Sequence, residues 1–203
     1  MRGSSRGSAK AVQAAFDTVL AGDPAWGTLA EELFAVTGVV DGSASLRRAL
    51  ADPSREGSDK QGLARSLFGG KIGETTTGLV ADVAGQRWSA ERDLADTLES
   101  LAVQALLAAA ERERRIDRVE DELFRFERIV AGDSGLRDTL SSRNTDGAGK
   151  ATLVHGLLEG KAAPETVRLV EQAVRVPRGR GSTGSWSPTS TWPRSAVTSS
   201  SRS

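Results

Sequence analysis

Three features of the sequence contain residue types that could do chemistry or bind an ion: one histidine, a glycine–lysine motif and an acidic cluster. His155 is the only histidine, it lies in the segment KATLVHGLLEG, and the chain has no cysteine. A catalytic or metal-bound histidine needs a base, carboxylate or second ligand held beside it, and the sequence shows no fixed partner for His155. We therefore predict a surface or half-buried histidine on a helix.

The glycine–lysine motif, Gly69-Gly70-Lys71, resembles the end of a phosphate-binding loop. Such a loop requires an earlier glycine and a Ser or Thr after the lysine. This chain has Arg65 and Ile72 at those positions, and the motif recurs as Glu159-Gly160-Lys161. The recurrence favours a helix terminus, where glycine ends the helix and lysine stabilises its negative end.

The acidic cluster consists of Glu120, Asp121 and Glu122. Its neighbours Arg118, Arg125 and Arg128 lie at helical spacing from it, so paired surface charges explain the cluster better than a metal site does. No part of the sequence brings together a nucleophile, a base and oxyanion donors. We predict a protein that is not an enzyme and has no catalytic residue, no cofactor and no metal.

The composition limits the possible partners. The 203 residues contain 27 basic and 27 acidic side chains, so no global positive field attracts nucleic acid or an anionic membrane. Tyrosine is absent and aromatic residues are few, which disfavours stacking of single-stranded nucleic acid. The N-terminal segment has no signal core, and no apolar run reaches about 18 residues. We expect no nucleic acid partner and no direct membrane insertion.

The elements that carry these residues occur twice. Residues 29–88 align with residues 119–178 at a constant offset of 90, with 17 identities in 60 positions and no gap. Apolar residues recur at three-and-four spacing in both segments. The sequence therefore predicts an all-α fold, a tandem duplicated helical bundle. Its expected parts are copy one at 1–110, an incomplete copy two at 111–180, and a disordered tail at 181–203.

Helix boundaries follow from glycine, proline and capping residues. The first helix is expected over 9–20, and Asp23 is expected to cap a second helix whose first turn contains Pro24. The run ERERRIDR at 111–118 fits either a continuous helix or a joint. Further helices are expected at 46–50, 60–68, 136–140, 150–158 and 166–174, and one marked by Leu79, Val80 and Val83 is expected to end near 85–88.

The tail has a composition unlike the rest of the chain. Residues 181–203 contain 9 Ser and 4 Thr and no Leu, Ile, Lys or acid, so they cannot bury enough apolar surface to offset the cost of ordering. One hypothesis is a frameshift near Arg180 that replaced a sixth helix of copy two with out-of-frame sequence. The alternative is a native Ser/Thr-rich linker.

The segment RVEDELFRFERIV and the doubled pattern LRRALADPSREGSDKQGLARSLFGGKIGETTTGLVADVAGQRW carry a family resemblance. Together they resemble the delta subunit of bacterial F-type ATP synthases in its longer actinobacterial form, whose mitochondrial counterpart is the oligomycin-sensitivity-conferring protein. The resemblance covers about residues 1 to 180. It implies a non-catalytic stator subunit that is C-terminally truncated or frameshifted here.

The resemblance also implies partners and a location. Family members hold the N-terminal helix of an alpha subunit in an apolar groove, join the b subunits of the peripheral stalk, and lie at the cytoplasmic face of the cell membrane. Attachment to b is in doubt for this sequence. The groove is expected in copy two, although burial in the core is the simpler interpretation of the same residues: Ile116, Val119, Leu123, Leu169, Val170 and Ala173.

Two alternatives come from other functional classes. A helical adaptor unrelated to the synthase would have the same composition. A small helical RNA-binding protein of the antitermination type would also form such a bundle. The RNA-binding alternative requires a basic stripe, and the interspersed acids argue against it.

Overall fold

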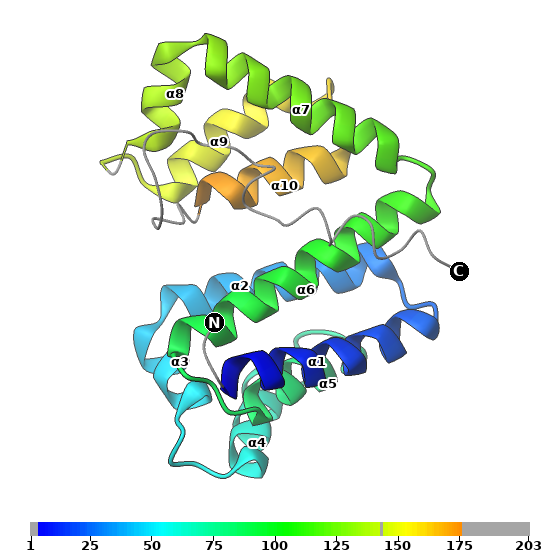
Figure 1. Cartoon of the computed structure of the whole chain (residues 1–203), viewed down its shortest axis with the longest axis vertical. Helices are drawn as coiled ribbons and strands as arrows, with labels where there is room; N and C mark the ends of the chain where they lie inside the picture. The colour runs from blue at the N-terminus through cyan, green and yellow to red at the C-terminus, as the bar shows by residue number, and fades with distance from the viewer. Residues whose placement is uncertain (1–3, 143, 176–203) are drawn as a thin grey trace. The chain divides into compact units, whose positions relative to one another are not determined.

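The structure is a computed structural model that describes residues 4–142 and 144–175. These residues form ten α-helices and no strand (Figure 1), so the all-α prediction is confirmed. The predicted tail lies outside the described residues. The helices are α1 (Ser4–Ala21), α2 (Trp26–Gly42), α3 (Ala44–Ala51), α4 (Gly57–Phe68), α5 (Glu74–Gly85), α6 (Glu91–Arg112), α7 (Ile116–Gly132), α8 (Ser134–Ser141), α9 (Gly147–Leu158) and α10 (Pro164–Arg175).

The chain divides into two compact units, residues 1–106 and 107–203. The division falls within α6, whose last turn and a half belongs to the second unit. The bounds of α7, α8, α9 and α10 are those of α2, α3, α4 and α5 plus 90 residues. The duplication seen in the sequence is therefore a duplication of helices, with the same start and end positions in both copies.

The helix ends of the two copies use equivalent hydrogen bonds. Ser43 accepts from the Leu46 N–H at the start of α3, and Asp133 accepts from the Leu136 N–H at the start of α8. A polar side chain that bonds an otherwise unpaired N–H in the first turn stabilises a helix by about 1 kcal/mol. A side-chain N-cap thus begins the equivalent helix in each copy.

The glycine–lysine motif ends α4 and α9, as predicted. Gly70 and Gly160 have φ angles of 72° and 71°, a left-handed conformation that glycine adopts without steric cost. Lys71 Nζ donates to the Leu67 carbonyl at 2.8 Å, and Lys161 Nζ donates to the Leu157 carbonyl at 3.1 Å. The motif is a helix terminus in both copies.

Each copy buries one lysine, and the two have different acceptors. Lys60 is 1% exposed and donates to the Gln86 carbonyl after α5 at 2.6 Å, and burial lowers its pKa. Lys150 is 2% exposed and donates to the Ser142 carbonyl after α8. A buried cation requires such an acceptor, so each lysine fixes a loop to its bundle.

Three local predictions need correction or completion. Asp23 does not cap α2: it has a φ of 54° and accepts a hydrogen bond from Trp26 Nε1, and α2 begins at Trp26, after Pro24. The first helix begins at Ser4, five residues before the predicted start. The ERERRIDR run is a joint, because α6 ends at Arg112 and Arg114 has a φ of 56°.

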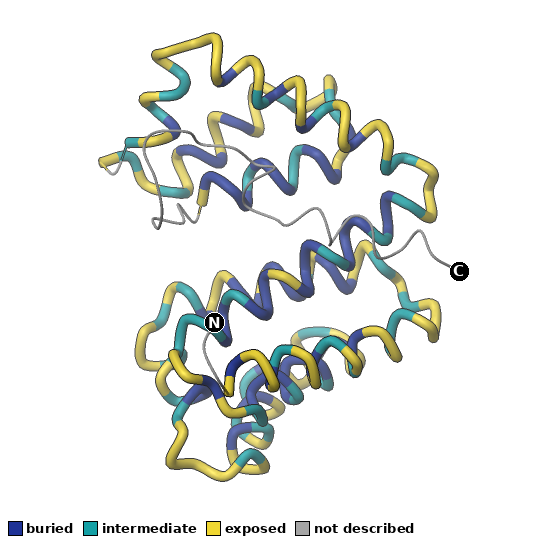
Figure 2. Tube along the Cα trace, in the orientation of Figure 1, coloured by how far each residue is buried: buried dark blue, intermediate teal, exposed yellow. Residues whose placement is uncertain are grey.

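Both units have an apolar core, drawn dark blue in Figure 2. In the first unit, Gln13 of α1 is hydrogen-bonded to Gln104 of α6, and Ser5 donates to Asp93. The first turn of α6 also reaches the end of α2, where Arg92 pairs with Asp41 at 3.1 Å. In the second unit, α10 packs against α7 and α9. None of the helices described has the length and apolarity needed to cross a membrane.

Candidate partner-binding surface

The candidate groove in copy two would be built from α7 and α10, and a carboxylate joins these helices. Glu122 of α7 accepts hydrogen bonds from the Ala163 N–H at 2.7 Å and from Thr166 Oγ1 at 2.6 Å. Both donors belong to the N-terminal end of α10. A carboxylate at this position satisfies unpaired N–H groups and interacts favourably with the positive end of the helix.

The first copy repeats this arrangement. Glu32 of α2 accepts from the Gly73 N–H at 2.8 Å and from Thr76 Oγ1. This role was not predicted, although the glutamate and the threonine both recur at the offset of 90. Because each glutamate and the N–H that it accepts from are more than 40 residues apart in sequence, no local pattern could reveal the contact.

The environment of Glu122 keeps it ionised. Burial acts to raise its pKa, but hydrogen bonds from Thr166, the Ala163 N–H and Arg118 outweigh burial, so the pKa lies below its ordinary value. Arg118 Nε lies 2.7 Å from Glu122 Oε1. Glu122 is therefore ionised at neutral pH, and its negative charge stabilises the N-terminal end of α10.

A second ionic contact joins the start of α7 to α10. Arg115 pairs with Glu165, which is 5% exposed, and also with Glu113. The hydrogen bond from Arg115 to Glu165 raises the pKa of the arginine further. The equivalent positions in copy one are Ala25 and Thr75, so this ion pair is specific to the second copy.

The structure places most of the predicted groove residues inside the second unit. Ile116 is half-buried, and the other five are buried, with exposures of 0% to 9%. They occupy facing helices that pack together. In this structure they are core side chains rather than an open apolar strip, and their role in binding a partner stays a prediction. The five are Val119, Leu123, Leu169, Val170 and Ala173.

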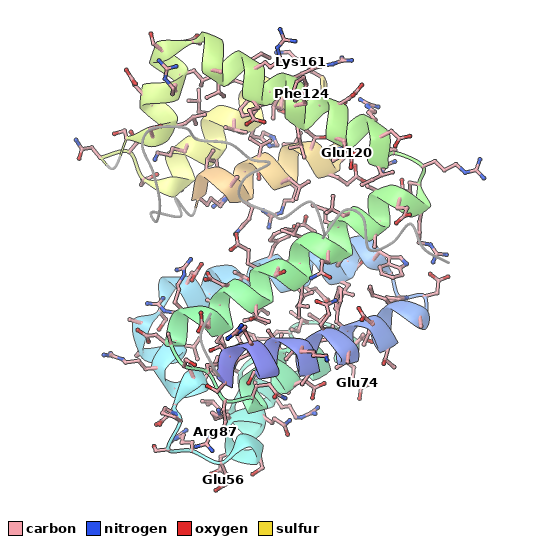
Figure 3. All side chains as sticks on the ribbon, in the orientation of Figure 1. Glu56, Glu74, Arg87, Glu120, Phe124 and Lys161 are labelled. Atoms are coloured by element: carbon pink, nitrogen blue, oxygen red, sulfur yellow. The ribbon has the colours of Figure 1, made fainter. Side chains whose placement is uncertain are left out.

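The exposed apolar side chains of the second unit are different residues. Phe124 is 57% exposed, Ile129 58%, Leu153 38% and Leu157 39%. Phe124 lies on α7 with Glu120, and both are labelled in Figure 3. The helical periodicity of the sequence selects the inward face of α7, so it did not mark Phe124.

The acidic cluster on α7 forms ion pairs, as predicted. Arg118 pairs with Glu122, and Arg125 pairs with Asp121 at 3.6 Å. The exposed pair of Arg125 and Asp121 contributes little stability, about 0.3 to 0.5 kcal/mol. Within 4–142 and 144–175 there is no group of three or more side chains that could hold a metal ion.

His155 lies on the surface at 50% exposure, but it does have carboxylate partners. Its Nδ1 lies 2.7 Å from Glu171 Oε1 on α10, and its Nε2 lies 3.5 Å from Glu159. Glu171 is 16 residues away, beyond any local pattern, whereas Glu159 lies one helical turn after His155 and was overlooked. The hydrogen bond to Glu171 raises the pKa of His155.

This geometry predicts a pH-dependent contact between α9 and α10. Because the folded-state pKa is raised, the stabilisation by His155 is fully present below the ordinary histidine pKa and is lost as pH rises through the folded-state value. NMR titration of this single histidine should give a pKa above that of an unstructured histidine peptide. Glu171→Gln should lower it markedly and Glu159→Gln much less; an unchanged pKa in Glu171→Gln would contradict the contact.

The chain is similar in sequence to proteins of one known family. Residues 103–180 match the family model described as ATP synthase delta (OSCP) subunit. The chain is 55% identical over 149 residues to a protein of Acidothermus cellulolyticus named ATP synthase subunit delta, covering 73% of this chain and 54% of that protein. Proteins of the same name from Kineococcus radiotolerans and Beutenbergia cavernae are 45% and 46% identical, over 87% and 89% of this chain and 64% and 67% of theirs. The chain thus spans about half to two thirds of the length of these relatives.

Proposed function

Because the chain belongs to the ATP synthase delta (OSCP) family, we propose that it is a non-catalytic subunit of the peripheral stalk, or stator, of a proton-translocating F-type ATP synthase. The observation that carries this proposal is the 55% identity with a delta subunit over 73% of the chain. A stator resists torque by binding at both of its ends and performs no chemistry itself. Two helical units in one chain suit that mechanical role.

The second copy is the proposed contact with the catalytic head. The family match covers residues 103–180, which include α7 to α10. The proposed partner is the amphipathic N-terminal helix of an alpha subunit, bound in an apolar groove between helices. Ile116 gives the most direct test of this groove, because it is the one predicted residue that remains half-buried while the others are enclosed.

We expect the full chain to bind a peptide of the alpha subunit's N-terminal helix, and Ile116→Ser to weaken that binding about tenfold or more. Burial of a large aliphatic side chain is worth about 1.5 to 3 kcal/mol, and about 1.4 kcal/mol corresponds to a factor of ten. The measurement is isothermal titration calorimetry. Ile129→Ser is the matched control, since Ile129 lies on the same helix and is 58% exposed.

The second proposed partner is the b subunit pair, which would place the protein at the cytoplasmic face of the membrane as a peripheral component. A pull-down with the soluble part of the b dimer tests this attachment beside the alpha peptide. We expect binding to b to be weak, because residues 181–203 contain no Leu or Ile to form an apolar docking face. Strong b binding that survives deletion of 181–203 would place the attachment within the two copies instead. Failure to bind either partner would contradict the stator proposal.

A further inference from the structure

One side of α7 differs sharply from the same side of α2. Ala30, Phe34 and Thr37 of α2 are 0%, 2% and 1% exposed. The residues 90 positions later are Glu120, Phe124 and Glu127; the first is exposed, Phe124 is 57% exposed, and Glu127 is half-buried. These three residues are here called the Phe124 face. The same phenylalanine is thus covered in copy one and uncovered in copy two.

The helices that both copies share do not explain this difference, because α2 to α5 and α7 to α10 have the same bounds. The positions 90 residues after α1 fall within α6, of which residues 91–106 belong to the first unit. The positions 90 residues after α6 are 181–202, which lie outside the described residues and contain no Leu or Ile. Arg92 of α6 pairs with Asp41 at the end of α2, so α6 is a helix beside α2 whose counterpart 90 residues later lies outside the described residues.

We propose that the Phe124 face is a docking site for an amphipathic helix of another polypeptide, which lies along α7 as α6 lies along α2. The first copy supplies the pattern of the occupant. The apolar ridge of α6 is Leu94, Leu98, Leu101 and Ala105, all 1% exposed or less. A helix with this spacing would bury the ring of Phe124.

The charges around Phe124 define the rest of the occupant. Within two turns on the same side of α7 lie four acids and one base, whereas the equivalent side of α2 has one acid, Glu31, and no base. Like charges facing one another weaken binding, and complementary charges favour it. The partner helix should therefore carry Lys or Arg beside its apolar ridge. The residues on α7 are Asp117, Glu120, Asp121, Glu127 and Arg128.

Binding at the Phe124 face does not require the chain to be a stator subunit, and it uses a side of α7 other than the one that contains Val119 and Leu123. The probes are two labelled peptides of residues 89–112. One has the natural sequence with five acids and two bases. In the other, Glu91, Asp96 and Glu99 are replaced by Lys, which leaves two acids and five bases and keeps the ridge.

Fluorescence anisotropy with the full chain should show binding of the basic peptide, and binding of the acidic peptide should be at least about tenfold weaker. Phe124→Ser should weaken binding of the basic peptide about tenfold or more, which is the loss expected for one large apolar contact. Val39→Ser is the matched control: Val39 lies on α2 at 53% exposure and should have no effect.

A charge variant gives an independent measure. Glu120→Lys should weaken binding of the basic peptide and strengthen binding of the acidic peptide, because Glu120 lies one helical turn before Phe124. Circular dichroism of each variant checks that the helices are intact. Equal binding to the natural chain and to Phe124→Ser, binding that is independent of peptide charge, or no binding of the basic peptide would overturn the proposal.

Discussion

Replacement of Leu169 by alanine is expected to lower the free energy of unfolding of the second unit by about 2 to 5 kcal/mol. Leu169 is 1% exposed on α10, so the substitution removes a buried side chain and leaves a cavity that the packed helices fill only in part. A domain is stable by about 5 to 15 kcal/mol. The loss is therefore a large part of the total, and urea unfolding followed by circular dichroism should show an earlier transition.

The first unit offers a matched variant and its own reporter. Leu79 is the equivalent residue, at 2% exposure on α5. Trp88 is 4% exposed and donates a hydrogen bond to the Val83 carbonyl at 2.9 Å, so its fluorescence reports unfolding of the first unit once the other three tryptophans are replaced by phenylalanine. Leu79→Ala should move the unfolding transition reported by Trp88 fluorescence to a lower urea concentration, and Leu169→Ala should leave that transition unchanged. Equal shifts by the two variants would show that the units unfold as one block.

The sequence predicted the fold because the signal for each helix is local. Apolar spacing and helix-ending glycines act within one or two turns, and the same signals at an offset of 90 confirm one another. Gly70 and Gly160 illustrate this, since a left-handed glycine followed by lysine ends a helix in both copies. Asp23 shows the limit: its side chain binds the Trp26 indole rather than a helix N–H, and propensity does not distinguish these two partners.

Contacts between segments that are distant in the sequence could not be predicted from the sequence. Glu122 and Thr166 recur in both copies, yet their hydrogen bond depends on the packing of α7 against α10. Phe34 and Phe124 are a clearer example, because the same residue type at equivalent positions of α2 and α7 is buried in one copy and exposed in the other. Periodicity shows that a residue lies on an apolar side of a helix, but the neighbouring helix decides whether it is covered.

Native-state hydrogen exchange is expected to show the second unit opening before the first. Among the described residues, the large apolar side chains that are exposed in the second unit are Phe124, Ile129, Leu153 and Leu157, and in the first unit only Val39 is. Full burial of a large apolar side chain stabilises a fold by about 1.5 to 3 kcal/mol, and a side chain that stays exposed to water contributes only part of this. A difference of about 3 kcal/mol in opening free energy corresponds to about hundredfold faster exchange.

The duplication allows this comparison to be made residue by residue. Leu50 and Leu140 are 1% and 2% exposed, and Leu79 and Leu169 are 2% and 1% exposed, so each pair has equal burial at an offset of 90. After correction for intrinsic rates, any difference within a pair reflects the stability of the unit and not the local environment. Faster exchange throughout 135–175 than throughout 45–85 is the expected result. Equal protection in both copies would show that the additional exposed apolar side chains do not lower the stability of the second unit.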